Sequence, residues 1–513
     1  MNKLFYLVLP FFLFSSFNIN AQIATKSAPK RELRGVWVAT VENIDWPSKA
    51  GLSADQQKQE LIGILEQHKA NGMNAIMFQV RPAADALYAK SREPWSRWLM
   101  GKQGIAPAPG YDPLEFIIGE AHQRGMELHA WFNPYRASTN VSHVVTDNHI
   151  TKTKPNWFFN YGGKKLFDPG IPEVKDYIIQ VILDVVKGYD VDGIHFDDYF
   201  YPYPIAGQTI KDAATFAKYK GSFTNIGDWR RDNVNQLVKE LGDSIKVYKN
   251  HIKYGLSPSA IWRNITEDKD GAKTAGLSTY NTLYADSRKW IKEGWVDYIN
   301  PQVYFSFTRK VAPFPVLVDW WGENTYGRHL YVGHGAYLVH KGNTKAEAAW
   351  GLPSQIPNQI RHVRGNNRAQ GSIFFSSKSL STVAKHLTDT LKKDLYKYPS
   401  LPPQMLWKDS IDPNAPENFD AVVRSDGVHL NWEAPLPAAD GETASGYVIY
   451  RFSEKDEINI SKPQNILRIS FLTYTSFIDT TAEKNKRYTY IVTALDRLKN
   501  ESIPSNYQGI LVQ

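Results

Sequence analysis

The sequence predicts an α/β chain in two parts, a (β/α)8 TIM-type barrel followed by an all-β sandwich. Eight short apolar runs alternate with helical patterns over roughly 345 residues, which is the size and rhythm of such a barrel with long loops. About 95 residues after them show strand patterns and no helical pattern. The length of 513 residues is too great for one ordinary core and agrees with more than one domain.

The expected barrel strands are rich in β-branched or aromatic residues, and each ends in polar or turn-forming residues. They cover residues 34–40, 75–82, 128–134, 193–198, 253–258, 298–304, 330–335 and 371–376. Helical periodicity between them covers residues 55–71, 113–125, 173–188, 228–241 and 287–294. An open doubly wound sheet is the nearest alternative, but no strand leads into a Gly-rich phosphate-binding turn. We therefore expect the barrel at residues 31–395.

The N-terminal segment has the pattern of a cleavable secretory signal, which we expect at residues 1–21. Lys3 gives a basic start, residues 4–17 form an apolar run, and Ala21 is a small residue at the expected cleavage point. A membrane anchor is the alternative, but about 14 apolar residues are too few to span comfortably. Since the chain has no Cys, disulfides and a lipid anchor are excluded. We expect a periplasmic or secreted protein.

Composition narrows the class of partner. The aromatic share of 13% fits carbohydrate binding, because aromatic rings offer flat apolar faces to sugar rings, and it fits a large aromatic core equally well. The formal net charge of +8 is spread along the chain, with no nucleic-acid motif and no run of five Lys or Arg. We therefore expect a glycan substrate, no nucleic-acid partner, no membrane span and a monomer.

The C-terminal part changes pattern after a linker rich in proline, expected at residues 396–415. Alternating strands at 427–432, 445–450 and 487–494 predict a sandwich at residues 416–513. This part resembles a fibronectin type III domain, with Trp432 at the core tryptophan position and Tyr488 at the tyrosine corner. We expect a spacer or adhesion module, and a barrel that folds without the residues after about 410.

The fourth barrel strand carries the expected chemistry. Asp197 and Asp198 stand where this strand leaves the barrel, at the end where barrel enzymes place their active sites. Adjacent carboxylates repel each other, so one proton can be held near neutral pH. That suits a general acid or a group that orients the substrate. The plainer alternative is that one of the two carboxylates merely caps the following loop.

Other strand ends supply planar hydrogen-bonding groups and aromatic faces, as a sugar pocket needs. The expected substrate-binding residues are Arg81, Asn133, Tyr135, Arg136, His195, Trp262, Gln302, Tyr304 and Tyr337.

Glycoside hydrolysis normally uses two carboxylates, so two mechanisms stay open. In one, Asp197 and Asp198 divide acid and orienting roles and an N-acetyl group of the substrate is the nucleophile. In the other, Asp85, Glu42 or Asp45 is the second carboxylate. The rival class is metal catalysis, in which His129, His195 and His334 would converge with Asp197. Zinc-binding motifs of the His-x-His or His-Glu-x-x-His kind are absent, so we expect neither a metal nor another cofactor.

The fourth strand also resembles the Asp-Gly-x-x-x-Asp motifs of chitinases and amylases, with Tyr199 where chitinases have a glutamate. The combination of motifs resembles the bacterial glycosyl hydrolase-like family 10. The matching stretches are RGVWVAT (34–40), FQVRP (78–82), AWFNPYR (130–136), FDPG (167–170), DGIHFDDY (192–199), NPQVY (300–304) and GSIFFS (371–376).

This resemblance covers about residues 31–390. It implies a (β/α)8 barrel that acts on β-linked glycans, with peptidoglycan strands stripped of peptides as the substrate class. Its catalytic site maps onto Asp197 and Asp198. Its substrate ligands map more loosely onto Arg81, Asn133, Arg136 and Tyr304. Two alternatives remain, a hydrolase of neutral plant or algal polysaccharide and a carbohydrate-binding barrel without catalysis.

Overall fold

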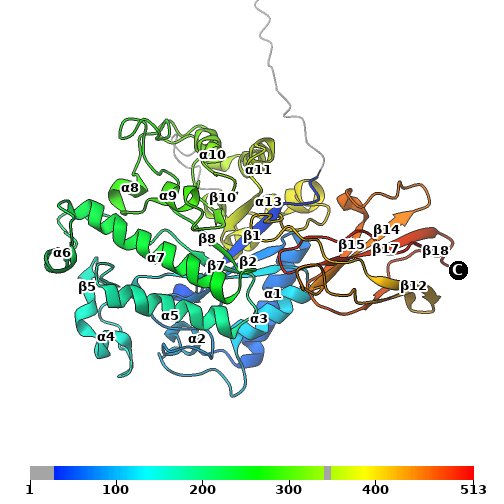
Figure 1. Cartoon of the computed structure of the whole chain (residues 1–513), viewed down its shortest axis with the longest axis horizontal. Coiled ribbons are helices and arrows are strands. Elements are labelled where there is room, and N and C mark those ends of the chain that lie inside the picture. The colour runs from blue at the N-terminus through cyan, green and yellow to red at the C-terminus, as the bar shows by residue number, and fades with distance from the viewer. Residues whose placement is uncertain (1–27, 340–347) are drawn as a thin grey trace, which may run out of the picture.

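The structure is a computed structural model that describes residues 28–339 and 348–513 (Figure 1). The secretory signal expected at residues 1–21 lies outside the described residues. Within the described ranges, no helix has both the length and the apolar character needed to cross a membrane.

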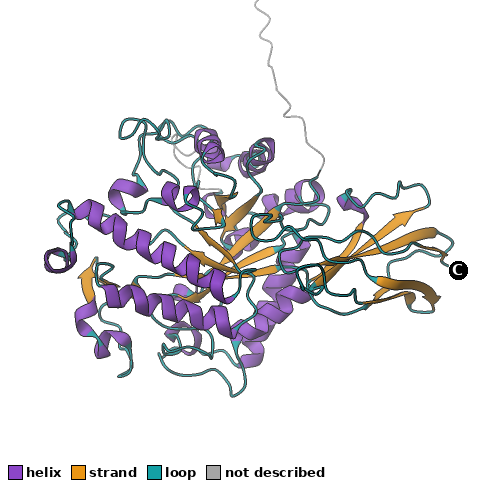
Figure 2. Ribbon diagram, viewed as in Figure 1, coloured by secondary structure: helices purple, strands orange, loops and turns teal. Residues whose placement is uncertain are grey.

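Eight parallel strands close into a barrel, as the sequence predicts, in the order β1-β11-β10-β9-β8-β7-β3-β2. They are β1 (Leu33–Val38), β2 (Ala75–Arg81), β3 (Glu127–Phe132), β7 (Gly193–Phe196), β8 (Lys253–Leu256), β9 (Tyr298–Ile299), β10 (His329–Gly335) and β11 (Gly371–Phe375). Figure 2 shows these strands enclosed by helices. Each strand starts within two residues of its predicted start, because apolar runs bounded by turn residues indicate buried parallel strands well.

The sixth barrel strand is much shorter than predicted. Only Tyr298–Ile299 is regular strand, and Gln302 makes isolated bridges to Ser259 and Gly333. Pro301 explains the break, because proline has no backbone N–H to continue the ladder. The interruption turns the Gln302 side chain towards the mouth of the barrel, where it contacts Asp198.

Helices cover the outside of the barrel, and five of them overlap the five helical stretches that the sequence predicts, while the others were not predicted. They are α1 (Ala54–Ala70), α2 (Arg97–Met100), α3 (Pro113–Gln123), α4 (Ile150–Thr153), α5 (Pro172–Gly188), α6 (Ala213–Tyr219), α7 (Ile226–Tyr248), α8 (Thr279–Thr282), α9 (Ser287–Lys292), α10 (Phe314–Glu323), α11 (Gln355–Gly365), α12 (Ser377–Thr382) and α13 (Lys385–Thr390). Local sequence fixes their starts: Ser53 and Gln56 form a reciprocal capping box on α1, and Asp112 caps α3 ahead of Pro113.

A small antiparallel sheet that the sequence did not predict lies between β3 and β7 along the chain. It consists of β4 (Arg136–Ser138), β5 (Phe158–Tyr161) and β6 (Lys164–Phe167), in the order β4-β6-β5. Gly162 and Gly163 both have positive φ in the turn that joins β5 to β6. Glycine tolerates this conformation without steric cost, so the Gly-Gly pair allows the hairpin.

The C-terminal part is a sandwich of two antiparallel sheets, in the orders β12-β13-β16 and β15-β14-β17-β18. The strands are β12 (Glu417–Arg424), β13 (Gly427–Glu433), β14 (Gly446–Ser453), β15 (Ile466–Ser470), β16 (Ser476–Asp479), β17 (Arg487–Leu495) and β18 (Gln508–Leu511). Trp432 lies in its core, and the Tyr488 hydroxyl accepts a hydrogen bond from the Glu483 N–H at 3.3 Å. These two features support the fibronectin type III resemblance, which itself stays a prediction.

The sandwich packs against the amino-terminal ends of the barrel strands, beside α1 and α3 (Figure 1). Lys499 reaches Asp192, immediately before β7, at 3.4 Å, and the Phe471 N–H donates to the His122 carbonyl at 3.0 Å. Leu498 joins the apolar cluster inside the barrel. The sandwich therefore closes the floor of the barrel and leaves the opposite end open.

The first half of the proline-rich linker is largely packed against the two domains. Leu401 lies in the sandwich-side cluster and Met405 in the barrel cluster, both fully buried. The Lys408 ammonium pairs with Asp297, ahead of β9, at 2.8 Å. Apolar residues between the prolines make these contacts, so the linker forms part of the interface between the two domains.

Candidate active site

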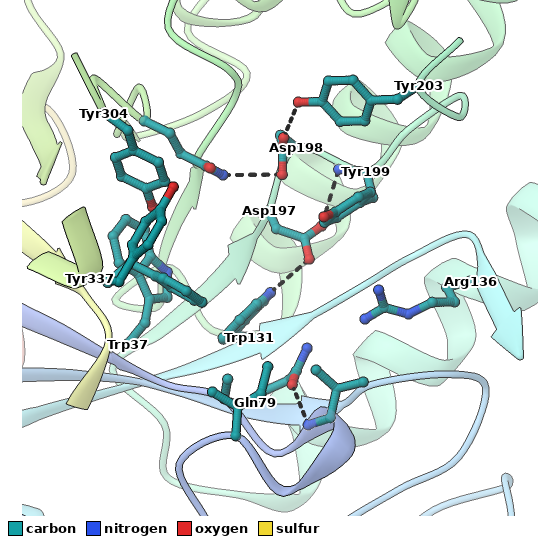
Figure 3. Close-up of a pocket in the computed structure, with 15 residues that line it drawn as sticks. Trp37, Gln79, Trp131, Arg136, Asp197, Asp198, Tyr199, Tyr203, Tyr304 and Tyr337 are labelled. Atoms are coloured by element: carbon teal, nitrogen blue, oxygen red, sulfur yellow. Dashed lines mark hydrogen bonds between the residues drawn. The ribbon is translucent and has the colours of Figure 1, made fainter. Parts of the chain in front are cut away.

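A cavity of about 330 Å³ opens at the carboxyl-terminal ends of the barrel strands (Figure 3). Its walls are mostly aromatic, and Asp197 and Asp198 are the two carboxylates among its described lining residues. The lining consists of Trp37, Ala39, Val41, Ile44, Gln79, Trp131, Arg136, Asp197, Asp198, Tyr199, Tyr203, Gln302, Tyr304, Tyr337 and Phe375. The site thus lies where a barrel enzyme binds its substrate.

Asp197 follows the last residue of β7 and is held by neutral donors. The Trp131 indole N–H donates to its Oδ2 at 3.2 Å, and the Asn133 amide donates to Oδ2 at 3.0 Å and to Oδ1 at 3.2 Å. The Tyr199 backbone N–H donates to Oδ1 at 3.3 Å. Since Trp131 and Asn133 come from β3 and the loop after it, the pairing of β3 with β7 fixes the position of this carboxylate.

Asp198 turns the other way and is held from different elements. The Tyr203 hydroxyl donates to its Oδ2, and the Gln302 amide donates to its Oδ1 at 3.1 Å. Gln302 also donates to the Ser257 carbonyl at 3.0 Å, which fixes its own orientation. Adjacent residues thus carry two carboxylates that are separately positioned, as Figure 3 shows.

Burial sets the protonation of this pair. Burial and the charge of Asp198 raise the pKa of Asp197 to about 7, against the lesser effects of Arg136 and Asn133. Burial also raises the pKa of Asp198, while its hydrogen bonds from Tyr203 and Gln302 oppose the rise. Near neutral pH the pair therefore holds a proton that it can give to a leaving group.

A chain of buried hydrogen bonds supports the floor of the cavity. The Trp37 indole N–H donates to His195 Nε2 at 3.1 Å, and His195 Nδ1 meets the Tyr298 hydroxyl at 3.0 Å. That hydroxyl also meets His129 Nδ1 at 3.0 Å, and His129 Nε2 meets Glu127 at 3.1 Å. Because an indole can only donate, the neutral His195 carries its proton on Nδ1, and every donor in the chain points away from the cavity. This arrangement fixes the ring of Trp37.

The predicted substrate-binding residues divide into three groups. Those that line the cavity are Arg136, Gln302, Tyr304 and Tyr337. Asn133 and Tyr135 line a smaller cavity beside it, which Arg136 shares. Arg81, His195 and Trp262 are absent from both linings.

Each of these three residues is engaged elsewhere. Arg81 is buried in a bidentate ion pair with Glu93 at 2.6 and 2.7 Å, and His195 lies below Trp37. Trp262 stacks on Trp320 with ring centroids 5.9 Å apart. Strand-end position could not distinguish side chains that point into the mouth from those that tie neighbouring loops together.

The three candidates for a second carboxylate lie outside the lining. Asp85 is buried and its Oδ1 accepts from the Ala83 N–H at 3.2 Å, while Glu42 is exposed. Asp45 accepts from the Ala39 N–H at 2.7 Å and from Ser376 at 2.8 Å. Asp85 and Asp45 hold loops through these bonds, and Glu42 lies outside the cavity lining, so the geometry favours the mechanism that uses Asp197 and Asp198 alone.

The histidines of the rival metal hypothesis are already occupied. His129 and His195 both contact Tyr298, and His334 is bonded through Nδ1 to Gln359 and through Nε2 to Ser372, each at 3.0 Å. All six ring nitrogens of His129, His195 and His334 have hydrogen-bond partners. Within the described residues, these histidines therefore do not converge on Asp197.

Sequence reasoning did not single out several lining residues as ligands: Trp37, Gln79, Trp131, Tyr199 and Tyr203. Gln79 is informative, because its Oε1 accepts from the Thr40 and Val41 N–H groups while its buried Nε2 lacks a partner among the described residues. Alternation along β1, β2 and β3 could have found Trp37, Gln79 and Trp131, because each lies near the carboxyl end of its strand.

Comparison with known proteins places most of the chain in one family. Residues 32–351 match the family described as glycosyl hydrolase-like 10. The chain belongs to this family. It is also 43% identical over 499 residues to glycosyl hydrolase YngK of Bacillus subtilis (strain 168), covering 96% of both chains. Glycosyl hydrolase DigH of Escherichia coli (strain K12) is 37% identical over 380 residues, covering 70% of this chain and 86% of DigH.

The solved structures add a more distant likeness. The glycoside hydrolase domain of PgaB (BpsB) from Bordetella bronchiseptica aligns at 11% identity with a TM-score of 0.43, covering 71% of this chain and 99% of that chain. The family assignment rests instead on the family match and on the two relatives. The match to glycosyl hydrolase-like 10 lies on the barrel, which carries the carboxylate pair at its mouth.

Proposed function

We propose that this protein hydrolyses a β-linked amino-sugar glycan, most specifically peptidoglycan strands free of peptides. The carrying observation is that Asp197 and Asp198 are both buried in the cavity wall and that a third carboxylate is missing from its described lining. Two adjacent carboxylates cannot flank the scissile bond as an ordinary acid and nucleophile do. An acetamido group on the substrate supplies the missing nucleophile.

In this mechanism Asp197 is the general acid, because its pKa of about 7 leaves it partly protonated near neutral pH. It gives its proton to the glycosidic oxygen while the C1–O bond breaks. The acetamido carbonyl oxygen attacks C1 and forms a cyclic oxazolinium ion. Asp198 accepts a hydrogen bond from the acetamido N–H and stabilises the positive charge of the oxazolinium ion. Water then attacks C1 and gives its proton to Asp197, while the bond between C1 and the acetamido oxygen breaks and restores the acetamido group. Two displacements at C1 retain the anomeric configuration.

The aromatic walls of the cavity bind the sugar. Tyr304 packs edge-on against Tyr337 with ring centroids 5.9 Å apart, and Phe375 lies beside both. Flat apolar faces bind the C–H faces of pyranose rings. The free Nε2 of Gln79 offers a donor to a hydroxyl or acetamido oxygen.

Peptidoglycan fits three features of the chain. Its sugars carry N-acetyl groups, peptide-free strands carry carboxylates that suit a protein of net charge +8, and the expected secretory signal would deliver the protein to the cell wall.

The test is mass spectrometry of peptide-free peptidoglycan strands incubated with the mature protein and with Asp197→Asn. We expect shorter oligosaccharides from the unmodified protein alone, with a new reducing end that identifies the bond cut. Cleavage of neutral plant or algal polysaccharide instead would replace the substrate class. Binding of strands without turnover by either protein would indicate a binding role.

Aryl glycosides of N-acetylhexosamine separate the two carboxylates. A good leaving group needs no proton, so Asp197→Asn should recover most of its kcat/KM, which reports the first step, on a dinitrophenyl glycoside, while Asp198→Asn should not. Equal recovery in both variants would contradict the division of roles.

A further inference from the structure

A second cavity, of about 170 Å³, adjoins the catalytic cavity. Arg136, Tyr199 and Tyr203 line both, so the two spaces share one wall. The remaining lining of the second cavity comes from the end of β3, from the β5–β6 hairpin and from the loop after β7: Asn133, Tyr135, Tyr161, Gly162, Lys164, Leu166, Phe200, Tyr201, Pro202 and Ile205. Its volume suits a substituent of a sugar bound in the catalytic cavity rather than a further length of glycan.

The walls of the second cavity are fixed by the fold. The Ile205 N–H donates to the Tyr161 hydroxyl at 2.8 Å, and the Gly162 N–H donates to the Gln208 side chain at 2.9 Å. Gly162 has φ of +58°, and a Cβ there would lie 2.6 Å from the Ile205 side chain. Glycine adopts this φ without steric cost, so the hairpin turn and its hydrogen bond to Gln208 fit beside the loop after β7.

Arg136 is the main polar group of the shared wall. It is 9% exposed, its Nε donates to the Pro82 carbonyl at 2.8 Å, and its guanidinium lies 5.5 Å from the centre of the Tyr199 ring. Among the described residues, no acceptor is bonded to its two Nη atoms. Figure 3 shows the guanidinium across the cavity from Tyr304 and Tyr337. A buried guanidinium with unused donors is suited to a bidentate anion.

The charge of the second cavity has one sign. Arg136 and Lys164 are the charged groups of its described lining, and carboxylates are missing from that lining. The other side chains are aromatic, aliphatic or amide groups, so the cavity combines a cation with apolar walls. A short acid with an apolar carbon chain matches both properties.

We propose that the second cavity binds a free carboxylate substituent of the sugar at the scissile bond, with Arg136 as the residue that recognises it. The lactyl ether of a muramic acid residue without peptide is such a group. This inference rests on the proposed function and explains its selectivity. A peptide would convert the carboxylate to an amide, which loses the charge-assisted pair and adds bulk that 170 Å³ does not hold.

The experiment crosses two proteins with two substrates. Unmodified protein and Arg136→Gln are each assayed on peptide-free strands and on the same strands after conversion of the carboxylates to methylamides. We expect the unmodified protein to prefer the free acid by about 10- to 100-fold in kcat/KM, and Arg136→Gln to lose that preference. Arg136→Lys should keep only part of it, since lysine cannot make the bidentate pair.

Other outcomes would overturn the inference. Equal cleavage of both substrates by the unmodified protein would show that the carboxylate is not recognised, while leaving the proposed function intact. Failure to cut either would instead defeat the proposed function. If Arg136→Gln slowed both substrates equally, Arg136 would act only through the charge of Asp197. The kcat/KM of Arg136→Gln would then still be higher on the free acid than on the methylamide. The alkaline limb of its pH profile would move to higher pH, because Arg136 lowers the pKa of Asp197.

The exposed Lys164 offers a matched control, because Lys164→Gln removes a charge from the rim of the same cavity without removing a buried donor. We expect this variant to change the acid preference less than threefold. A larger effect would move the recognition from Arg136 to the rim.

Discussion

Buried carboxylates at the two ends of the barrel have pKa values shifted in opposite directions. At the floor, burial alone would raise the pKa of Glu127, but Lys253 at 2.5 Å and His129 lower it to about 2. Asp192 is likewise held well below its ordinary pKa by His122 and Lys499 against the effect of burial. At the mouth, Asp197 meets neutral donors first, and its pKa rises to about 7.

This contrast separates stability from chemistry. Floor carboxylates are paired with cations, and Lys499, which pairs with Asp192, comes from the sandwich, so the second domain completes the electrostatics of the first. Mouth carboxylates are left with a proton to exchange, at some cost in stability. The barrel therefore keeps the carboxylates at its floor charged and keeps a carboxylate that can bind a proton at its mouth.

The largest expected effect comes from Glu127→Gln at the floor. The substitution leaves the Lys253 ammonium, 1% exposed, without its partner, and breaking a buried pair costs about 3 to 5 kcal/mol. The free energy of unfolding, measured in urea at pH 7, should fall by that amount. A change below about 1 kcal/mol would show that the floor pairs are not structurally important.

Lys499→Met tests whether the sandwich stabilises the barrel. Lys499 is buried against Asp192 and the Phe471 ring, but His122 still contacts Asp192 at 2.7 Å, so we expect a smaller loss of about 1 to 3 kcal/mol. The measurement is thermal unfolding of the whole chain. An unchanged Tm would instead support the expectation that the barrel folds without the residues after about 410.

Asp197→Asn should leave stability within about 1 kcal/mol at pH 3, where Asp197 is protonated, and should raise it at pH 8, where the buried carboxylate is charged. The same substitution abolishes acid catalysis. Because the folded pKa of about 7 lies above the ordinary 3.8, this group stabilises the fold fully below pH 3.8 and loses that contribution as pH rises through 7. Glu127 has the opposite sign, with stability present above pH 4.5 and lost as pH falls towards 2. The free energy of unfolding in urea would be measured between pH 3 and pH 8 for the unmodified protein and for each amide variant. The differences would show whether the two carboxylates change stability with pH in opposite directions.

The smallest expected effect is a shift in the pH dependence of activity. In the unmodified protein kcat/KM should decline above about pH 7, because the general acid Asp197 loses its proton. The Asn133 amide lowers the pKa of Asp197, so Asn133→Ala should move this limb upward by up to about one unit. A limb that stayed in place, or moved downward, would remove Asp197 as the titrating group.

Part of the site was predictable from local pattern. The placement of Asp197 and Asp198 follows from an apolar run that ends at Phe196, since a parallel strand in a barrel delivers its next residues to the mouth. The β5–β6 hairpin was missed, although Gly162 and Gly163 between aromatic strands are a turn signal. The sequence could not show that Arg81 lies outside the cavity lining, because its partner Glu93 lies in a loop whose path the sequence does not reveal.

The sequence alone thus determined the barrel, the sandwich and the position of the carboxylate pair, because these depend on periodicity and on chain order. Only the tertiary structure decided that Trp131 on β3 and Gln302 after β9 donate hydrogen bonds to the pair, that Asp85 and Asp45 lie outside the cavity lining, and that the second cavity exists. Closing the barrel brings distant strands together and excludes water. Burial on that scale, which moves the pKa of Asp197 to about 7, is a property of the closed barrel and not of any segment.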